Sequence, residues 1–172
     1  GPLGVYGASK LAGEEHVREA LERHVILRTS WLFSAQGHNF VKTMLRLGRE
    51  RDVLRVVNDQ HGKPTAADDL ADAILSIAAS LPSRQGGFGT FHFAGAGATT
   101  WFDFACAILR AQAAQTGRSP EMVPITSADY PTPAKRPRSS VLDTAALEAV
   151  HGIKPRAWED GLREVLAELG EL

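Results

Sequence analysis

The sequence contains very little cysteine, since Cys106 is the one thiol in 172 residues. One cysteine excludes an internal disulfide and any zinc site built from several cysteines. Cys106 lies in an apolar stretch with helical spacing, which predicts a buried, unreactive thiol. The 6 histidines are scattered, and none stands at ligand spacing from another histidine or from the cysteine. We therefore claim no metal site from the sequence.

An excess of charge of one sign is also missing, because 19 Lys and Arg stand against 20 Asp and Glu. Such a chain has no basic field to hold a nucleic acid or an anionic membrane surface. It also has no apolar run near the roughly 20 residues that span a bilayer, and no charged-then-apolar leader. The composition, 44% hydrophobic and 23% charged, is that of a globular protein. We expect a cytoplasmic protein.

A glycine-rich turn of the G-x-G-x-x-G type, placed between a strand and a helix, is absent from the sequence as well. Such a turn holds the pyrophosphate of a dinucleotide at a helix N-terminus. The glycine clusters at 86–89 and 95–97 lack this frame, which favours loops. The chain opens directly on GPLGVYGASK, with no strand before it, and its first four residues fit either native sequence or a tag remnant.

What the sequence does contain is an alternation of helical and strand-like segments. Apolar spacings of three and four predict helices over 6–21, 39–51, 66–81, 101–114, 144–150 and 158–169. Short apolar runs predict strands over 24–28, 53–57 and 88–94, with a loop or short strand over 115–124. Capping boxes are predicted at Thr65 with Asp68 and at Thr100 with Asp103. This order predicts an α/β fold with mainly parallel strands.

The pair Tyr6 and Lys10 carries the clearest chemistry. Residues four apart lie one above the other on a helix face. A lysine ammonium beside a phenol stabilises the phenolate, so such a tyrosine can exchange a proton with a carbonyl oxygen. A Tyr-x-x-x-Lys pair is common on surface helices, so the pair alone does not establish an active site.

The surrounding segments give the pair a context. The run Val5-Tyr-Gly-Ala-Ser-Lys-Leu-Ala-Gly-Glu14 resembles the active-site helix of the extended short-chain dehydrogenase/reductase superfamily. Other segments narrow this resemblance: Arg28-Thr-Ser-Trp-Leu-Phe33, Asn58-Asp-Gln-His-Gly-Lys-Pro-Thr65, Phe91-His-Phe-Ala-Gly95 and Tyr130-Pro-Thr-Pro-Ala-Lys-Arg-Pro137. In this order they resemble the dTDP-4-dehydrorhamnose reductase family over nearly the whole chain.

The resemblance implies an incomplete Rossmann-type parallel sheet with a small α/β substrate-binding lobe. Residues 1–60 would belong to the C-terminal half of the Rossmann domain, and 61–172 mainly to the substrate lobe, with some segments returning to the Rossmann part. It implies reduction of dTDP-4-dehydro-L-rhamnose to dTDP-L-rhamnose with NADPH or NADH. Tyr6 would be the general acid, and Lys10 its electrostatic partner and ribose anchor. Because the glycine-rich turn and the superfamily's upstream Ser or Thr are absent, we expect the C-terminal portion of a longer reductase, inactive by itself.

Two segments supply candidate residues where predicted elements begin or end. Ser30 and Trp31 follow a predicted parallel strand, and ligands of α/β sheets sit at such ends. We place Ser30 near the nicotinamide and Trp31 near the sugar, with core packing as the alternative for Trp31. Asn39 and Phe40 begin a helix whose exposed N–H groups favour a diphosphate, although Phe40 also suits a core.

Two further candidates lie in a turn and in a loop. Gln60 falls in a predicted turn over 59–62. The resemblance implies a place at the substrate wall, and a solvated side chain is the alternative. Arg136 stands with Lys135 and Arg138 in a proline-rich extended loop, where its planar fork suits a diphosphate; a solvated basic loop is the alternative.

Three questions stay open. Some members of the family bind magnesium through acidic residues at a dimer contact, and Asp68 and Glu168 fall near those places, but we do not claim the metal. A homodimer is one alternative for the assembly. The function has two alternatives as well: another nucleotide-sugar reductase or epimerase, or a non-catalytic regulatory subunit similar to that of methionine adenosyltransferase.

Overall fold

The computed structural model describes residues 1–83, 86–132 and 136–172. Lys135, which the sequence groups with Arg136, lies outside the described residues. The helices are α1 (Val5–Ala20), α2 (Phe40–Glu50), α3 (Ala67–Ser80), α4 (Trp101–Thr116), α5 (Ala145–His151) and α6 (Trp158–Glu168). The strands are β1 (Val25–Arg28), β2 (Leu32–Phe33), β3 (Val53–Val57), β4 (His61–Gly62), β5 (Thr65–Ala66), β6 (Gly89–His92), β7 (Thr99–Thr100) and β8 (Glu121–Ile125). Two 3₁₀ turns complete the set, η1 (Leu81–Ser83) and η2 (Ser127–Asp129).

The strands pair two by two. In the described residues β1 pairs with β6, β2 with β5 and β3 with β8, all parallel, whereas β4 and β7 are antiparallel. Parallel neighbours need a long crossover connection, and a helix lies between the partners of each of these three parallel pairs. The predicted α/β class with mainly parallel strands is confirmed.

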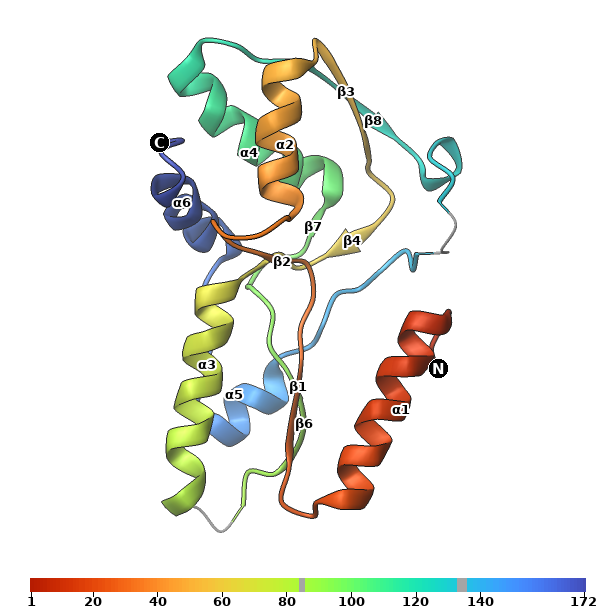
Figure 1. Cartoon of the computed structure of the whole chain (residues 1–172), viewed down its shortest axis with the longest axis vertical. Coiled ribbons are helices and arrows are strands. Elements are labelled where there is room, and N and C mark those ends of the chain that lie inside the picture. The colour runs from red at the N-terminus through yellow and green to blue at the C-terminus, as the bar shows by residue number, and fades with distance from the viewer. Residues whose placement is uncertain (84–85, 133–135) are drawn as a thin grey trace.

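The elements form two lobes (Figure 1). In the first lobe, α1 and α3 lie on opposite sides of the β1–β6 ribbon, and α5 packs on β6. In the second, α2 and α4 pack together beside the β3–β8 ribbon, with α6 next to them. The short pairs β2–β5 and β4–β7 lie where the lobes meet.

Each lobe has its own buried cluster. The larger cluster holds the second lobe and includes Phe33, Val41, Phe104, Ile108 and Leu166. A smaller cluster, with Ile77, Phe91, Phe93 and Leu147 among its members, lies between the β1–β6 ribbon and helices α3 and α5. Both ranges expected from the sequence, 1–60 and 61–172, contribute residues to both clusters, so each range packs against the other in both lobes. The division near residue 60 stays a prediction about the domains of the reductase.

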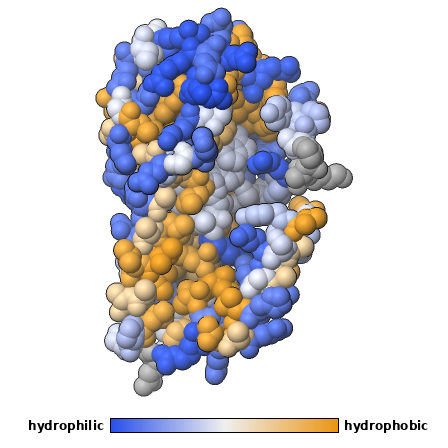
Figure 2. Space-filling view, in the orientation of Figure 1, coloured by the Kyte–Doolittle hydropathy of each residue, from blue (hydrophilic) through white to orange (hydrophobic). Residues whose placement is uncertain are grey.

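The surface is apolar over α3 (Figure 2), where Ile74 and Leu75 are 49% and 66% exposed. No helix within 1–83, 86–132 and 136–172 is both long enough and apolar enough to cross a membrane.

The structure corrects four local predictions, and the first two concern the cap at Thr65 and the burial of Cys106. Thr65 does not cap α3: it belongs to β5, and its hydroxyl accepts the N–H of Gly95 at 3.3 Å. The cap at Thr100 is confirmed, because its hydroxyl accepts the N–H of Asp103 at 3.1 Å. Cys106 is half-buried rather than buried.

The other two corrections concern local structure. The turn expected over 59–62 ends in strand β4, paired with β7. Helix α1 buries no residue. The sequence places Leu11, Val17 and Leu21 on or near one apolar face, but Val17 and Leu21 are 39% and 60% exposed.

Candidate active site

Helix α1 presents the Tyr6 and Lys10 pair at its N-terminal end. The Tyr6 side chain is exposed, and the Lys10 Nζ stands 5.6 Å from the centroid of the Tyr6 ring. The spacing of four residues along one helix therefore brings the ammonium beside the phenol, as the sequence predicts.

Ion pairs fix α1 to the strands beside it. The Glu14 carboxylate accepts two hydrogen bonds from the Arg28 guanidinium on β1, from Nε at 2.7 Å and Nη2 at 2.5 Å. Arg18 donates to the same carboxylate at 2.8 Å and to Thr90 on β6 at 3.1 Å. The hydrogen bonds from Arg28 hold the pKa of Glu14 below its usual value, despite partial burial.

Trp31 directly follows β1 in an unusual backbone conformation, with φ at +47°. Non-glycine residues rarely adopt positive φ, so the surroundings have to hold it. Its ring stacks on Trp101, with centroids 3.6 Å apart and planes within 10°. It also lies against Gly62, where a Cβ would come within 2.2 Å of the ring. Gly62 is therefore required for this placement.

A cavity of about 360 Å³ lies between α1 and the loop after β1. Five of the predicted site residues line it together: Tyr6, Ser30, Trp31, Gln60 and Arg136. They come from α1, from the end of β1, from the segment before β4 and from the 136–140 segment. Backbone bonds hold that last segment to β4, since His61 donates to the Arg138 carbonyl and Ser140 donates to the His61 carbonyl, each at 2.8 Å.

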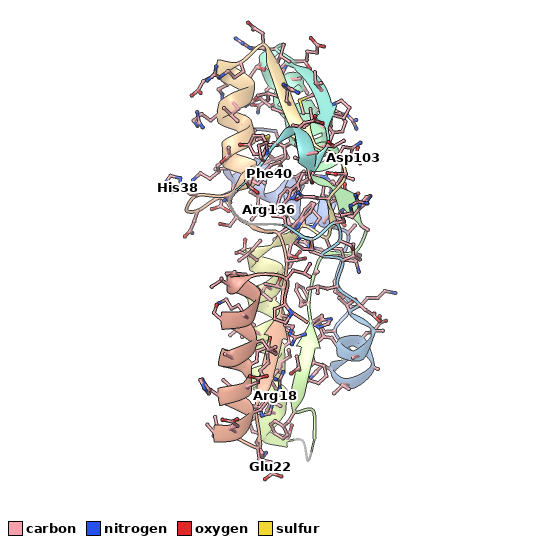
Figure 3. All side chains as sticks on the ribbon, turned by 90° about the vertical axis from the view of Figure 1, so that its right-hand side faces the viewer. Arg18, Glu22, His38, Phe40, Asp103 and Arg136 are labelled. Atoms are coloured by element: carbon pink, nitrogen blue, oxygen red, sulfur yellow. The ribbon has the colours of Figure 1, made fainter. Side chains whose placement is uncertain are left out.

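A second cavity, of about 480 Å³, adjoins the first and shares Gln60, Trp101 and Arg136 with it. Phe40, Arg55 and Tyr130 are among its other lining residues. Figure 3 shows Arg136 just below Phe40, near the end of α2 that faces α1. The described linings of both cavities carry arginines and no carboxylate, so together they favour an anionic ligand.

Two predicted residues lie outside both linings. Lys10 stands over Tyr6 and lines neither of these two cavities. Asn39 is the N-cap of α2: its Oδ1 accepts the N–H of Lys42 at 3.3 Å, and its Nδ2 donates to the Ser34 carbonyl at 2.7 Å. The contacts of Asn39 are those of a helix cap, and its role toward a diphosphate stays a prediction.

Trp101 is the main residue that sequence reasoning left without a role. It begins α4, lines both cavities and packs on Phe40 as well as Trp31, with the Phe40 centroid at 4.6 Å. The sequence did hold a clue, because Trp101 directly follows the helix cap Thr100 and so stands at the N-terminal end of a helix, where a large aromatic residue is not needed to start the helix. Its pairing with Trp31, seventy positions earlier, is a tertiary contact.

The residues present fit one end of a nicotinamide dinucleotide. Tyr6 and Ser30 share a cavity, and the Lys10 ammonium stands beside Tyr6; the binding of a ribose by Lys10 stays a prediction. For a metal, the described residues hold no group of three or more His, Cys, Asp or Glu placed to bind an ion. Asp68 and Glu168 are both exposed.

Comparisons with known proteins place this geometry in a family. The family model described as the RmlD substrate binding domain matches residues 1–171. A dTDP-4-dehydrorhamnose reductase of Sinorhizobium fredii is 44% identical over 168 residues, which cover 96% of this chain and 57% of the relative. The enzyme of that name from Escherichia coli K12 is 40% identical over 98% of this chain and 57% of its own length.

Solved structures agree. A dTDP-4-dehydrorhamnose reductase from Clostridium acetobutylicum matches with a TM-score of 0.90 and 39% identity, over 99% of this chain and 57% of that one. The enzyme from Bacillus anthracis, solved with NADP, matches with a TM-score of 0.87 and 35% identity, over 98% of this chain and 57% of that one. A UDP-glucose 4-epimerase from Brucella ovis, at 19% identity and a TM-score of 0.72, shares the fold.

The chain thus spans about 57% of the length of the curated relatives it matches. The family match covers nearly every residue, from α1 with its tyrosine and lysine to α6. The predicted resemblance is confirmed: the chain belongs to the RmlD substrate binding domain family of the dTDP-4-dehydrorhamnose reductases.

Proposed function

We propose that this chain supplies the substrate cavity and the proton donor of a reductase that converts dTDP-4-dehydro-L-rhamnose to dTDP-L-rhamnose. The observation that carries the proposal is the cavity of about 360 Å³ in which Tyr6 stands together with Trp31 and Arg136. The names of the relatives support the substrate, and the NADP in the Bacillus anthracis structure supports NADPH or NADH as the reductant.

The chemistry requires a hydride at the carbonyl carbon and a proton at its oxygen. Reduced nicotinamide, when bound, supplies the hydride. Tyr6 donates the proton of its hydroxyl to the carbonyl oxygen and becomes a phenolate, which the Lys10 ammonium stabilises. Arg136 and Arg55 neutralise the diphosphate, and the stacked Trp31 and Trp101 rings form an apolar wall for the sugar.

The proposal is tested in two steps. The 172-residue chain should bind dTDP-L-rhamnose in isothermal titration calorimetry and should not oxidise NADPH with dTDP-4-dehydro-L-rhamnose. Joined to the part of the Sinorhizobium fredii relative that it does not cover, it should catalyse that reaction. Turnover of UDP-sugars in preference to dTDP-sugars would favour an epimerase or another reductase. A fused protein that folds, remains inactive and co-purifies with methionine adenosyltransferase would favour a regulatory subunit.

In the fused enzyme, Tyr6→Phe should lower kcat by about 10²–10⁴-fold with little change in substrate affinity, the range of general acid catalysis. The matched control is Tyr130→Phe, the other of the 2 tyrosines, which lines the second cavity and not the first. It should keep kcat, and any effect should be on substrate affinity. A Tyr6→Phe enzyme with full kcat would remove the proton-donor role.

A cytoplasmic location and a homodimer complete the proposal. Support for association comes from the exposed Ile74 and Leu75 on α3. Light scattering of the purified fused enzyme measures its assembly, and a monomer at micromolar concentration would remove the homodimer.

A further inference from the structure

We propose that Asp59 and Ser127 are positioning residues that orient the Gln60 side-chain amide, so that Gln60 Oε1 accepts a hydrogen bond from the substrate. The identity of the substrate rests on the proposed function, whereas the orientation rests on the contacts of these three residues. Gln60 is well placed for such a role, because it lines both cavities at their junction.

The three side chains form one hydrogen-bonded chain between distant segments. Gln60 Nε2 lies 2.8 Å from Ser127 Oγ, and Ser127 Oγ lies 2.7 Å from Asp59 Oδ1. The backbone N–H of Ser127 donates to the same Asp59 oxygen at 2.9 Å. Asn58 donates its backbone N–H to the Ile125 carbonyl at 2.8 Å, which fixes the two segments side by side.

The direction of the protons follows from what each group can donate. An ionised carboxylate only accepts, so the single hydroxyl proton of Ser127 is given to Asp59. Ser127 Oγ then has only lone pairs left for Gln60, and the amide has to turn its NH₂ toward it. Gln60 Oε1 is thereby the end of the amide that points away from Ser127.

Asp59 remains a carboxylate under ordinary conditions. The hydrogen bonds from the Ser127 hydroxyl and backbone N–H hold the pKa of Asp59 below its usual value, with a smaller contribution from the charge of Arg138. At neutral pH the Ser127 hydroxyl therefore donates to Asp59, and the Gln60 NH₂ donates to the Ser127 hydroxyl oxygen.

A fixed acceptor at this place selects the chemistry of the ligand. The bond to Ser127 is the one hydrogen bond of the Gln60 side chain within the part of the protein that the structure describes. Gln60 is half-buried, so a ligand that covers Oε1 without a donor would leave it unsatisfied, at a cost in affinity. The matching ligand group is a hydroxyl or an N–H, either on the sugar or on the nucleoside.

The test uses calorimetric binding of dTDP-L-rhamnose and of dTDP to this chain. Ser127→Ala removes the hydroxyl but keeps the backbone bond to Asp59, so it is the cleanest variant. It should weaken binding of dTDP-L-rhamnose by about three- to tenfold, the scale of one hydrogen bond. Ser127→Thr, which keeps the hydroxyl, should bind dTDP-L-rhamnose with the affinity of the unmodified chain. Weakening with both ligands assigns the donor to the nucleotide, and weakening with dTDP-L-rhamnose alone assigns it to the sugar.

A double-mutant cycle shows whether Ser127 acts through Gln60. Gln60→Ala should weaken binding by about tenfold, and adding Ser127→Ala should cause no further loss. The matched control is Thr126→Ala, which breaks the neighbouring cap between Thr126 and Asp129 and leaves Gln60 untouched. Its affinity should equal that of the unmodified chain.

Three results would overturn the inference: unchanged affinity of Ser127→Ala, additive losses in the double variant, or an equal loss in Thr126→Ala. Failure of the unmodified chain to bind dTDP-L-rhamnose would instead count against the proposed function. Melting temperatures of all variants check that each one folds.

Discussion

Helices α1 and α4 are each 16 residues long, yet they are held in opposite ways. α4 buries five residues, among them Phe104, Ile108 and Gln112, and it begins at a hydroxyl cap. α1 buries none, and its N-cap residue, Gly4, makes no side-chain cap. The helix that carries the proposed proton donor is thus the one with little core of its own.

Charge takes the place of apolar packing on α1. The side of α1 that is partly shielded from solvent includes Gly7, Leu11, Glu14 and Arg18. Its firmest contacts are the ion pairs of Glu14 with Arg28 and Arg18, and the Glu14 side chain is only 14% exposed. A core holds a helix by burying area, whereas an ion pair holds it at one point and depends on pH and salt. The difference predicts distinct responses of the two helices.

The largest effect is expected in the core of α4. Phe104 is fully buried and packs on the rings of Phe33, Phe40 and Trp158. Phe104→Ala should lower the free energy of unfolding by about 3–5 kcal/mol, because it removes buried area and leaves a cavity. Urea denaturation measures this change. Val5→Ala, at an 87% exposed position of α1, should change it by less than about 0.5 kcal/mol. Equal losses would contradict the contrast between the helices.

A smaller and more local effect is expected on α1. Glu14→Gln removes the negative charge that pairs with both Arg28 and Arg18. The free energy of local unfolding of α1 should therefore fall by about 1 kcal/mol. Hydrogen exchange should speed up in α1 and stay unchanged in α4. Glu15→Gln, at an exposed position of the same helix, serves as the control. Protection of α1 that survives Glu14→Gln would show that apolar contacts hold the helix.

Acid should weaken the same attachment. The pKa of Glu14 is lowered in the folded protein, mainly by its hydrogen bonds with Arg28, from an ordinary value of 4.5. The stabilisation that ionised Glu14 gives to the folded state is therefore complete above pH 4.5, and it is lost as the pH falls through the lower pKa of the folded protein. Amide NMR signals of α1 should broaden or shift in this acid range before those of α4. The Glu14→Gln variant should lack this step.

The smallest effect concerns cysteine reactivity. Burial, and then the charge of Asp103, raise the pKa of the Cys106 thiol on α4. At neutral pH Cys106 should react more slowly with a thiol reagent in the folded chain than in urea. A cysteine placed on the exposed side of α1 by Ser9→Cys, in a Cys106→Ala background, should react faster than Cys106 in the folded chain. Equal rates would mean that the Cys106 thiol is as accessible and as reactive as an exposed one, which would contradict its shielding by α4.

The sequence predicted most elements well, because their signal is local. Apolar spacings of three and four placed a helix over 39–51, and the structure has it over Phe40–Glu50. The two-residue strands β2, β4, β5 and β7 were not predicted, since two residues show no periodicity. The apolar spacing of Leu11, Val17 and Leu21 predicted one face of the first helix, yet Leu21 is exposed, because what a helix face contacts is decided elsewhere in the chain.

For the candidate site, resemblance to a family supplied residues that no spacing could connect. It gave Tyr6 its role, whereas Trp31 was predicted from its place after a strand and Arg136 from its planar guanidinium; the structure brings the three to one cavity. It gave no role to Trp101 or Ser127, whose contacts reach across about 70 positions of the chain to Trp31 and Gln60. Hydrogen-bond direction and ring stacking depend on such pairs, so they cannot be read from either segment alone.

The sequence by itself determined the α/β alternation, the helix cap at Thr100 and the tyrosine and lysine on one face of α1, because each follows from residues within a few positions. Only the tertiary structure decided that α1 is attached through the carboxylate of Glu14, and that Trp31, at positive φ, packs between Trp101 and Gly62. It also decided that Asp59 and Ser127 set the Gln60 amide. The physical reason is the same in each case: a charge, a ring or a hydrogen-bond donor acquires its role from a partner, and the partners meet only when the chain has folded.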